Sequence, residues 1–152
     1  WADPPACAVG EPRKSYRGEH KLPLILQNLH RYFFYIAVVY VVILTWDGLR
    51  AFFFTTPEGG TEFGIGIGSI VLLTNAVLLG GYTFGCHCAR HLFGGRHDCI
   101  SKIPVRQGCY NCATALNKKH MNWAWFSLVW VGFTDLYVRL CSMGIWSDWR
   151  IL

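Results

Sequence analysis

Apolar stretches without charge, separated by polar segments, set the pattern of this sequence. The clearest runs from Gly64 to Gly85 without one charged residue. A helix needs about 20 apolar residues to cross a bilayer core, so this stretch predicts a transmembrane helix over residues 64–86. Its repeated glycines allow a neighbouring helix or a cofactor to approach the backbone closely.

Residues 29–54 and 121–146 are apolar along most of their length and predict two further transmembrane helices. The pattern as a whole therefore predicts an all-α membrane protein with about three transmembrane helices. Because the chain begins with Trp1 rather than methionine, we expect further sequence upstream. The predicted helices then form part of a larger bundle.

An acid and a base lie together near the end of each of these two stretches. Asp47 and Arg50 are three residues apart, and Asp135 and Arg139 are four apart. Side chains at these spacings share one face of a helix. We therefore expect structural ion pairs, or side chains that extend towards the membrane surface, rather than a proton path.

The segments between the apolar stretches differ in charge. Residues 1–31 are polar and basic, residues 55–64 form an acidic, glycine-rich turn, and residues 86–121 form a long basic loop rich in cysteine and histidine. Cytoplasmic loops of membrane proteins carry an excess of lysine and arginine. This rule predicts that the N-terminal segment and the 86–121 loop lie in the cytoplasm and that the C-terminus lies outside.

Composition agrees with a membrane protein. Hydrophobic residues make up 53% of the chain and charged residues only 15%, against about 25% charged in soluble domains. The net charge of +5 could suggest nucleic acid, but basic loops that fix membrane orientation explain it better. We expect no nucleic-acid partner.

The 86–121 loop carries the candidate chemistry. It holds five of the seven cysteines and four of the six histidines of the chain, which is too many for side chains that merely pack. Disulfides are not expected because cytoplasmic thiols stay reduced. The residues concerned are Cys86, His87, Cys88, His91, His97, Cys99, Cys109, Cys112 and His120.

Three kinds of site are compatible with these residues. Thiolate and imidazole ligands hold 2Fe–2S clusters of the Rieske type, in which two histidines replace two cysteines on one iron. Zinc takes the same ligands. Haem b is the third possibility, since His30, His87, His91 and His120 all lie at one side of the membrane and could clamp its iron from two helices. Spacing alone does not separate them.

Short motifs spread over residues 29–150 resemble a known family, the membrane anchor of succinate dehydrogenases that carry a membrane-embedded Rieske-type cluster. This chain resembles the C-terminal half of that anchor protein, which has roughly five helices. The motifs are Leu29-His30-Arg31-Tyr32-Phe33, Asn75-Ala76-Val77-Leu78-Leu79, Tyr82-Thr83, Cys86-His87, Arg90-His91, Gly94-Gly95, Pro104-Val105-Arg106, Leu116-Asn117, Lys119-His120-Met121, Trp123-Ala124-Trp125 and Thr134-Asp135-Leu136-Tyr137.

The resemblance implies a component of respiratory complex II in the bacterial plasma membrane. Its partners would be the flavoprotein and iron–sulfur subunits, membrane lipid, and the anchor sequence upstream of Trp1. Electrons would pass through a 2Fe–2S cluster to a quinone. The chain has no flavin- or substrate-binding motif, so we expect no catalytic residue in it and a non-catalytic role in an oxidoreductase.

The resemblance also implies the site residues. The family motif reads Cys-His-x-Cys-x-His, whereas here the second thiol comes one position early, as Cys88, and Ala89 follows it. The expected metal ligands are Cys86, His87, Cys88 and His91, with His120 first, and Cys112 or Cys109 next, as a ligand from elsewhere. The expected quinone contacts are His30, Arg31, Tyr82, Arg90, Trp123 and Trp125.

Overall fold

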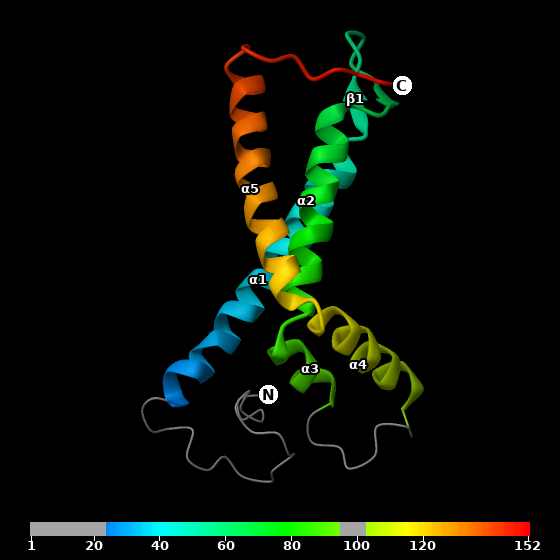
Figure 1. Cartoon of the computed structure of the whole chain (residues 1–152). Coiled ribbons are helices and arrows are strands. Elements are labelled where there is room, and N and C mark those ends of the chain that lie inside the picture. The colour runs from blue at the N-terminus through cyan, green and yellow to red at the C-terminus, as the bar shows by residue number, and fades with distance from the viewer. Residues whose placement is uncertain (1–23, 95–102) are drawn as a thin grey trace. The chain divides into compact units, whose positions relative to one another are not determined.

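A computed structural model describes residues 24–94 and 103–152 of the chain. The predicted N-terminal segment up to residue 23, together with His97 and Cys99, lies outside the described residues. The described elements are α1 (Leu24–Arg50), β1 (Phe53–Thr55), β2 (Thr61–Phe63), α2 (Ile67–Phe84), α3 (His87–Gly94), α4 (Pro104–Asn117) and α5 (His120–Ser142), shown in Figure 1.

The mostly helical architecture confirms the predicted all-α membrane fold. Two helical segments, Leu29–Arg50 and Ile67–Phe84, are long and apolar enough to cross a membrane. Helix α5 has 23 residues and is about 34 Å long at 1.5 Å per residue, but it is not among these two. A third membrane crossing by α5 stays a prediction.

Two segments differ in local structure from what the sequence predicts. The predicted turn at 55–64 contains the end of β1 and the whole of β2, which form an antiparallel hairpin in which Phe53 pairs with Phe63 and Thr55 with Thr61. The 86–121 segment is not an open loop, because it contains α3 and α4. Helix α4 begins with a proline in its first turn, where the missing N–H costs nothing.

Contacts divide the chain into two compact units. In the described part of the chain, the first unit comprises residues 24–38, 81–94 and 103–120, and the second comprises residues 39–80 and 121–152. Helices α1 and α2 contribute residues to both units. Each unit has its own buried residues and is described by itself.

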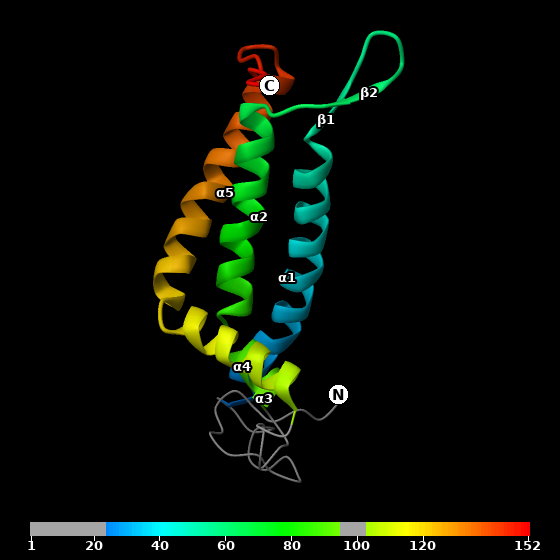
Figure 2. The ribbon, with the colours of Figure 1, turned by 90° about the vertical axis from the view of Figure 1, so that its right-hand side faces the viewer.

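In the second unit, α2 lies between α1 and α5 (Figure 2), and α5 diverges from α2 towards the end that holds the hairpin and the C-terminal segment (Figure 1). Gly48 is buried, and a Cβ there would lie 3.2 Å from the Leu73 Cα, so α1 and α2 approach closely. The indole of Trp130 donates to the Val71 carbonyl at 3.1 Å and ties α5 to α2.

The C-terminal segment packs against the start of α2. The backbone N–H of Ile67 donates to the Trp149 carbonyl, and that of Ile151 donates to the Ile65 carbonyl. The Asp148 carboxylate accepts bonds from the Gly68 N–H and from the Tyr137 hydroxyl, each at 2.8 Å. An acidic side chain at this helix N-terminus satisfies an N–H that has no partner within the helix.

Of the two ion pairs predicted near the helix ends, one is formed. Arg139 and Asp135 form the predicted pair, with Nε and Oδ2 2.8 Å apart. Asp47 and Arg50 are both exposed, and the salt bridges of the described residues do not include one between them. Their predicted pairing is therefore wrong, and the expectation that remains for them is extension towards the membrane surface.

Candidate metal centre

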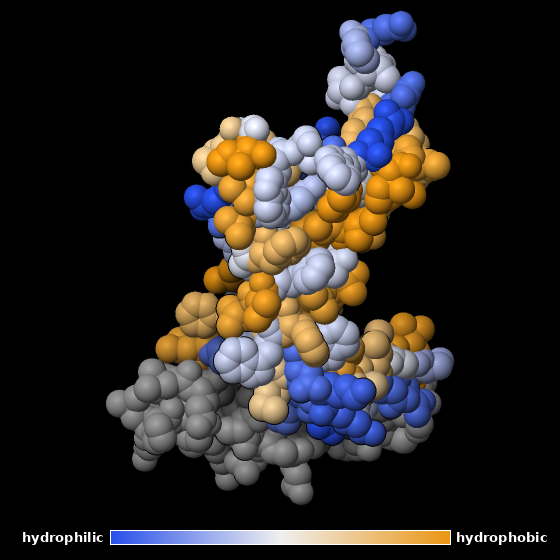
Figure 3. Space-filling view, turned by 45° about the horizontal axis from the view of Figure 1, so that its top comes forward, coloured by the Kyte–Doolittle hydropathy of each residue, from blue (hydrophilic) through white to orange (hydrophobic). Residues whose placement is uncertain are grey.

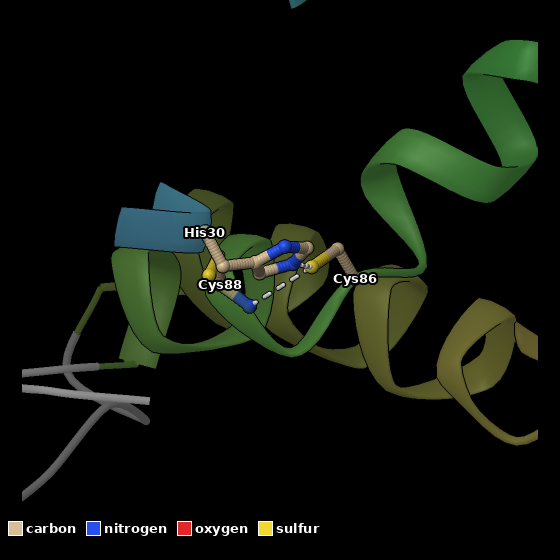
Figure 4. A group of neighbouring side chains, drawn as sticks. All are labelled: His30, Cys86 and Cys88. Atoms are coloured by element: carbon tan, nitrogen blue, oxygen red, sulfur yellow. Dashed lines mark hydrogen bonds between the residues drawn. The ribbon is translucent and has the colours of Figure 1, made fainter. Parts of the chain in front are cut away.

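Three ligand atoms from two separate segments meet in the first unit. His30 comes from α1, Cys86 from the link after α2, and Cys88 from the first turn of α3 (Figure 4). One ligand atom from each residue lies within 4.8 Å of the other two. His30 Nε2 and Cys86 Sγ are 2.9 Å apart, and the Cys88 backbone N–H donates to the same sulfur at 3.4 Å.

The link between α2 and α3 positions the two thiols of this group. Gly85 directly follows α2, and a Cβ there would lie 2.7 Å from the Gly81 carbonyl oxygen and 3.2 Å from the Leu116 Cβ. A side chain at this position would therefore clash with the backbone of α2 and press on α4. Asn117 Nδ2 donates to the Gly85 carbonyl at 2.8 Å and holds the junction to the end of α4.

Both thiols are buried in a small apolar core. Cys86 and Cys88 pack with Phe34 and Ala89, and the partly buried side chains around them are Tyr35, Val38, Leu92 and Phe93. Cys88 is 3% exposed and Cys86 6%. Water is therefore largely excluded from the sulfur atoms.

The surroundings of Cys86 favour its ionised form. A hydrogen bond from the Cys88 side chain is the largest cause that lowers the pKa of the Cys86 thiol to about 5, against the opposing effect of burial, and the His30 imidazole and the Cys88 backbone N–H add to the lowering. Cys86 is then a thiolate at neutral pH. The thiolate is the form of cysteine that binds metal.

His87 and His91 form a second pair on α3, next to this group in the sequence. Their Nε2 atoms are 2.8 Å apart, with one ring donating and the other accepting. Burial, followed by the nearby charges of His87, Arg90 and Arg31, lowers the pKa of His91 to about 4. His91 is therefore neutral at physiological pH, as a metal-binding imidazole must be.

Contacts from α4 hold α3 in place. Arg106 donates from its guanidinium to the Phe93 and Leu92 carbonyls, at the C-terminal end of α3. Arg90 donates to the Tyr110 hydroxyl at 2.9 Å, and its guanidinium lies 5.3 Å from the centre of the Tyr110 ring. The helix that carries Cys88 and the imidazole pair is thus fixed to α4 at two places.

His120 lies apart from the His30, Cys86 and Cys88 group. Its ring stacks on Tyr82, with centroids 4.8 Å apart and planes 13° from parallel. Its Nδ1 atom is buried, and the described residues offer it no hydrogen-bond partner. The sequence predicts His120 as a ligand and Tyr82 as a quinone contact, and the structure brings these two together.

The other predicted residues are distributed as follows. His30, expected at a quinone or a haem, lies with the thiols instead of with the other histidines. His87 and His91 are outside the group of three and face each other. Trp123 and Trp125 belong to the second unit, where Trp125 is 64% exposed. Cys109 and Cys112 are exposed on α4.

The signal that could have placed His30 with the thiols is present in the sequence. His30 stands at the start of one membrane helix, and Cys86 follows the end of the next. Consecutive antiparallel helices bring such positions to the same side. If only the histidines at this side are considered, their closeness suggests a haem site. If Cys86 and Cys88 are considered as well, it suggests the group of His30 with the two thiols.

Comparisons with known proteins agree with this picture. A profile of the family "Actinobacterial succinate dehydrogenase subunit SdhC" matches residues 1–144. A chain in the Mycobacterium smegmatis Sdh1 complex in the apo form is 44% identical, with a TM-score of 0.74. The match covers 96% of the present chain and 53% of that one, so the present chain spans about half its length.

Comparison with curated proteins found no significant match. The family match covers most of the chain, and the structural match combines high identity with a shared fold. Both agree with the family that the sequence motifs resemble. The chain therefore belongs to the family of actinobacterial succinate dehydrogenase subunit SdhC.

Proposed function

We propose that this chain is part of the membrane anchor of a succinate:quinone oxidoreductase and carries electrons through a 2Fe–2S cluster with mixed cysteine and histidine ligands. The observation that supports this most is the group formed by His30, Cys86 and Cys88 next to two apolar helices. Its thiols are buried and one of them is a thiolate at neutral pH.

The donor set would supply three of the four ligands of a Rieske-type cluster. Such a cluster needs two cysteine thiolates on one iron and two imidazoles on the other. Cys86 and Cys88 would supply the thiolates and His30 one imidazole. The second imidazole would come from α3, from His87 or His91, because each lies within three residues of Cys88. A cluster held there would accept and release one electron at a time.

The ring pair of Tyr82 and His120 is the proposed contact for a quinone. Aromatic rings pack against planar ligands, and a quinone carbonyl needs a hydrogen-bond donor. The buried Nδ1 of His120, which has no partner among the described residues, can supply that bond. Arg31, Arg90, Trp123 and Trp125 stay candidates for further contacts.

Charge supports the proposed orientation and partners. The described residues of the first unit include Arg31, Arg90, Arg106, Lys118 and Lys119 and no Asp or Glu. An excess of basic residues is typical of the cytoplasmic side. The flavoprotein and iron–sulfur subunits would bind there, while the exposed apolar side chains along the helices (Figure 3) would contact lipid or further helices.

Metal analysis and EPR of the purified complex test the proposal. Iron and labile sulfide should be present beyond the content of the partner subunits, and the reduced complex should give a Rieske-type signal. Cys86→Ser and Cys88→Ser should each abolish this signal. Cys141→Ser is the matched control, since Cys141 lies in α5 of the second unit, and it should keep the signal.

Zinc is the second candidate, because two thiolates and one imidazole also fit a zinc site. Zinc without additional iron in the complex, together with unchanged quinone reduction in Cys86→Ser, would favour that structural role over electron transfer. An absorption spectrum of the reduced complex distinguishes haem b from both candidates, because haem b gives sharp visible bands. The first proposal expects no such bands from this chain.

A further inference from the structure

Helix α4 carries a pair of thiols away from the candidate metal centre. Cys109 and Cys112 are both exposed, and neither is in a disulfide. A neighbouring face of α4 contacts the protein, where Ala113 is 2% exposed and Tyr110 holds Arg90. The two thiols therefore share the outer face of a helix that is anchored on its inner face.

The spacing of the pair suits a reversible bond between the two sulfur atoms. Residues three apart in a helix have Cα atoms about 5 Å apart, which lies within the range of about 4.4–6.8 Å found in disulfides. Their Cβ atoms are about 5–6 Å apart in an undistorted helix, whereas a disulfide needs about 3.5–4.5 Å. Closure is thus within reach but requires a local distortion.

The surroundings of the pair leave room for that distortion. A Cβ built on Gly108 meets no atom within 4 Å, so the outer side of this turn is open. Gln107 and Asn111, which flank the thiols, are also exposed. A disulfide closed with distortion in an exposed position is easily reduced again.

We propose that Cys109 and Cys112 are a redox-active dithiol that closes to an intrahelical disulfide by exchange with a low-molecular-weight disulfide. One cysteine thiolate attacks the small disulfide, forms a mixed disulfide and releases one small thiol. The second cysteine then attacks the mixed disulfide and releases the other. Two protein thiols are oxidised, one small disulfide is reduced to two thiols, and the two cysteine protons pass to these products.

Closure affects a contact of the candidate metal centre. The bridged turn contains Tyr110, whose hydroxyl accepts the Arg90 hydrogen bond. Arg90 directly precedes His91 on α3. The inference about the dithiol depends only on α4 and does not depend on which group the centre holds.

Mass spectrometry of membranes that contain the assembled complex tests the inference. The membranes are incubated with oxidised glutathione, alkylated with iodoacetamide and digested with trypsin. Cleavage after Arg106 and Lys118 gives the peptide 107–118, which contains only these two cysteines. The expected product is this peptide without alkylation and lighter by two hydrogen atoms, restored to the doubly alkylated form when dithiothreitol is added before alkylation.

Cys109→Ser is the matched control, because it leaves Cys112 without its neighbour. In this variant Cys112 should keep the glutathione adduct instead of losing it. The inference is overturned if both wild-type cysteines stay alkylated, if each carries its own glutathione adduct, or if either is linked to a cysteine outside the peptide.

Discussion

His30 and Cys86 are 56 positions apart in the sequence, yet His30 Nε2 lies 2.9 Å from Cys86 Sγ. The contact joins the start of one apolar helix to the link that follows the next. An imidazole N–H that donates to the sulfur stabilises the thiolate, and this is one cause of the pKa of Cys86 being lowered to about 5. The pair therefore links the fold of the first unit to the protonation state of a candidate ligand.

We predict that His30→Ala raises the pKa of the Cys86 thiol. Because the pKa of Cys86 is lower in the folded than in the unfolded protein, thiolate formation stabilises the folded state. This stabilisation is complete at a pH above the pKa of Cys86 in the unfolded protein. This stabilisation is lost as the pH falls towards about 5. Without His30, the stabilisation that the Cys86 thiolate contributes should be smaller, and it should be completely lost at a higher pH.

Iodoacetamide labelling of Cys86 as a function of pH measures this in detergent-solubilised protein depleted of metal. The midpoint of labelling should move upwards from about 5 in the variant. Labelling of Cys141, which is in the second unit, is the internal control and should not change. An unchanged midpoint for Cys86 would show that His30 does not stabilise its thiolate.

The helices could be predicted because their signals are local. The uncharged stretch that ends at Gly85 predicts a membrane helix directly, and α2 ends at Phe84. The helices α3 and α4 were missed because their sequence is polar and lies between stronger apolar signals. Contacts such as that of Arg106 with the end of α3 hold these helices together, and they come from tertiary structure and not from local sequence.

The site was predicted in part for a similar reason. Cys86 and Cys88 lie close together in sequence as well as in space, so local spacing identified them. His30 joins them only through the packing of α1 against the α2–α3 junction, which no local pattern encodes. The Tyr137–Asp148 bond was also missed, because both residues appear ordinary in an apolar helix and a short tail.

The contact between Asp148 and α2 should matter for stability. Asp148→Ala removes the acceptor of both the Gly68 N–H and the Tyr137 hydroxyl. Hydrogen bonds to a charged group contribute about 1.5–3 kcal/mol each when well buried. Because Asp148 is itself exposed, we expect a loss of about 1–2 kcal/mol in total, measured by denaturation of the purified protein in detergent.

Glu62→Gln provides the control for the same end of the molecule. It removes the exposed Arg150–Glu62 pair, whose atoms are 3.4 Å apart. Exposed ion pairs contribute about 0–1 kcal/mol, so the free energy of unfolding should change little. Equal losses in the two variants would mean that charge, and not the bonds of Asp148, stabilises this region.

Asn117 should stabilise the junction that carries Cys86. Asn117→Ala removes the donor to the Gly85 carbonyl, at a cost of about 0.5–1.5 kcal/mol for a neutral hydrogen bond. Asn111→Ala changes an exposed residue of the same helix and should cost less. Thermal unfolding of the two variants in detergent compares them, and the prediction fails if Asn111→Ala is the more destabilising.

Two glycines should respond in opposite ways to replacement by alanine. At Gly85 the new Cβ would lie 2.7 Å from the Gly81 carbonyl oxygen and 3.2 Å from the Leu116 Cβ. Gly81 lies in α2 and Leu116 in α4, so Gly85→Ala should distort the end of α2 and weaken its contact with α4. This should destabilise the first unit and reduce the iron content of the complex. Gly108→Ala meets no atom within 4 Å and should instead stabilise α4 by up to about 1 kcal/mol, because alanine favours the helix. Denaturation curves and iron analysis of both variants measure these effects. The close approach at Gly85 would not be needed for the fold if Gly85→Ala matched the wild type in both measurements.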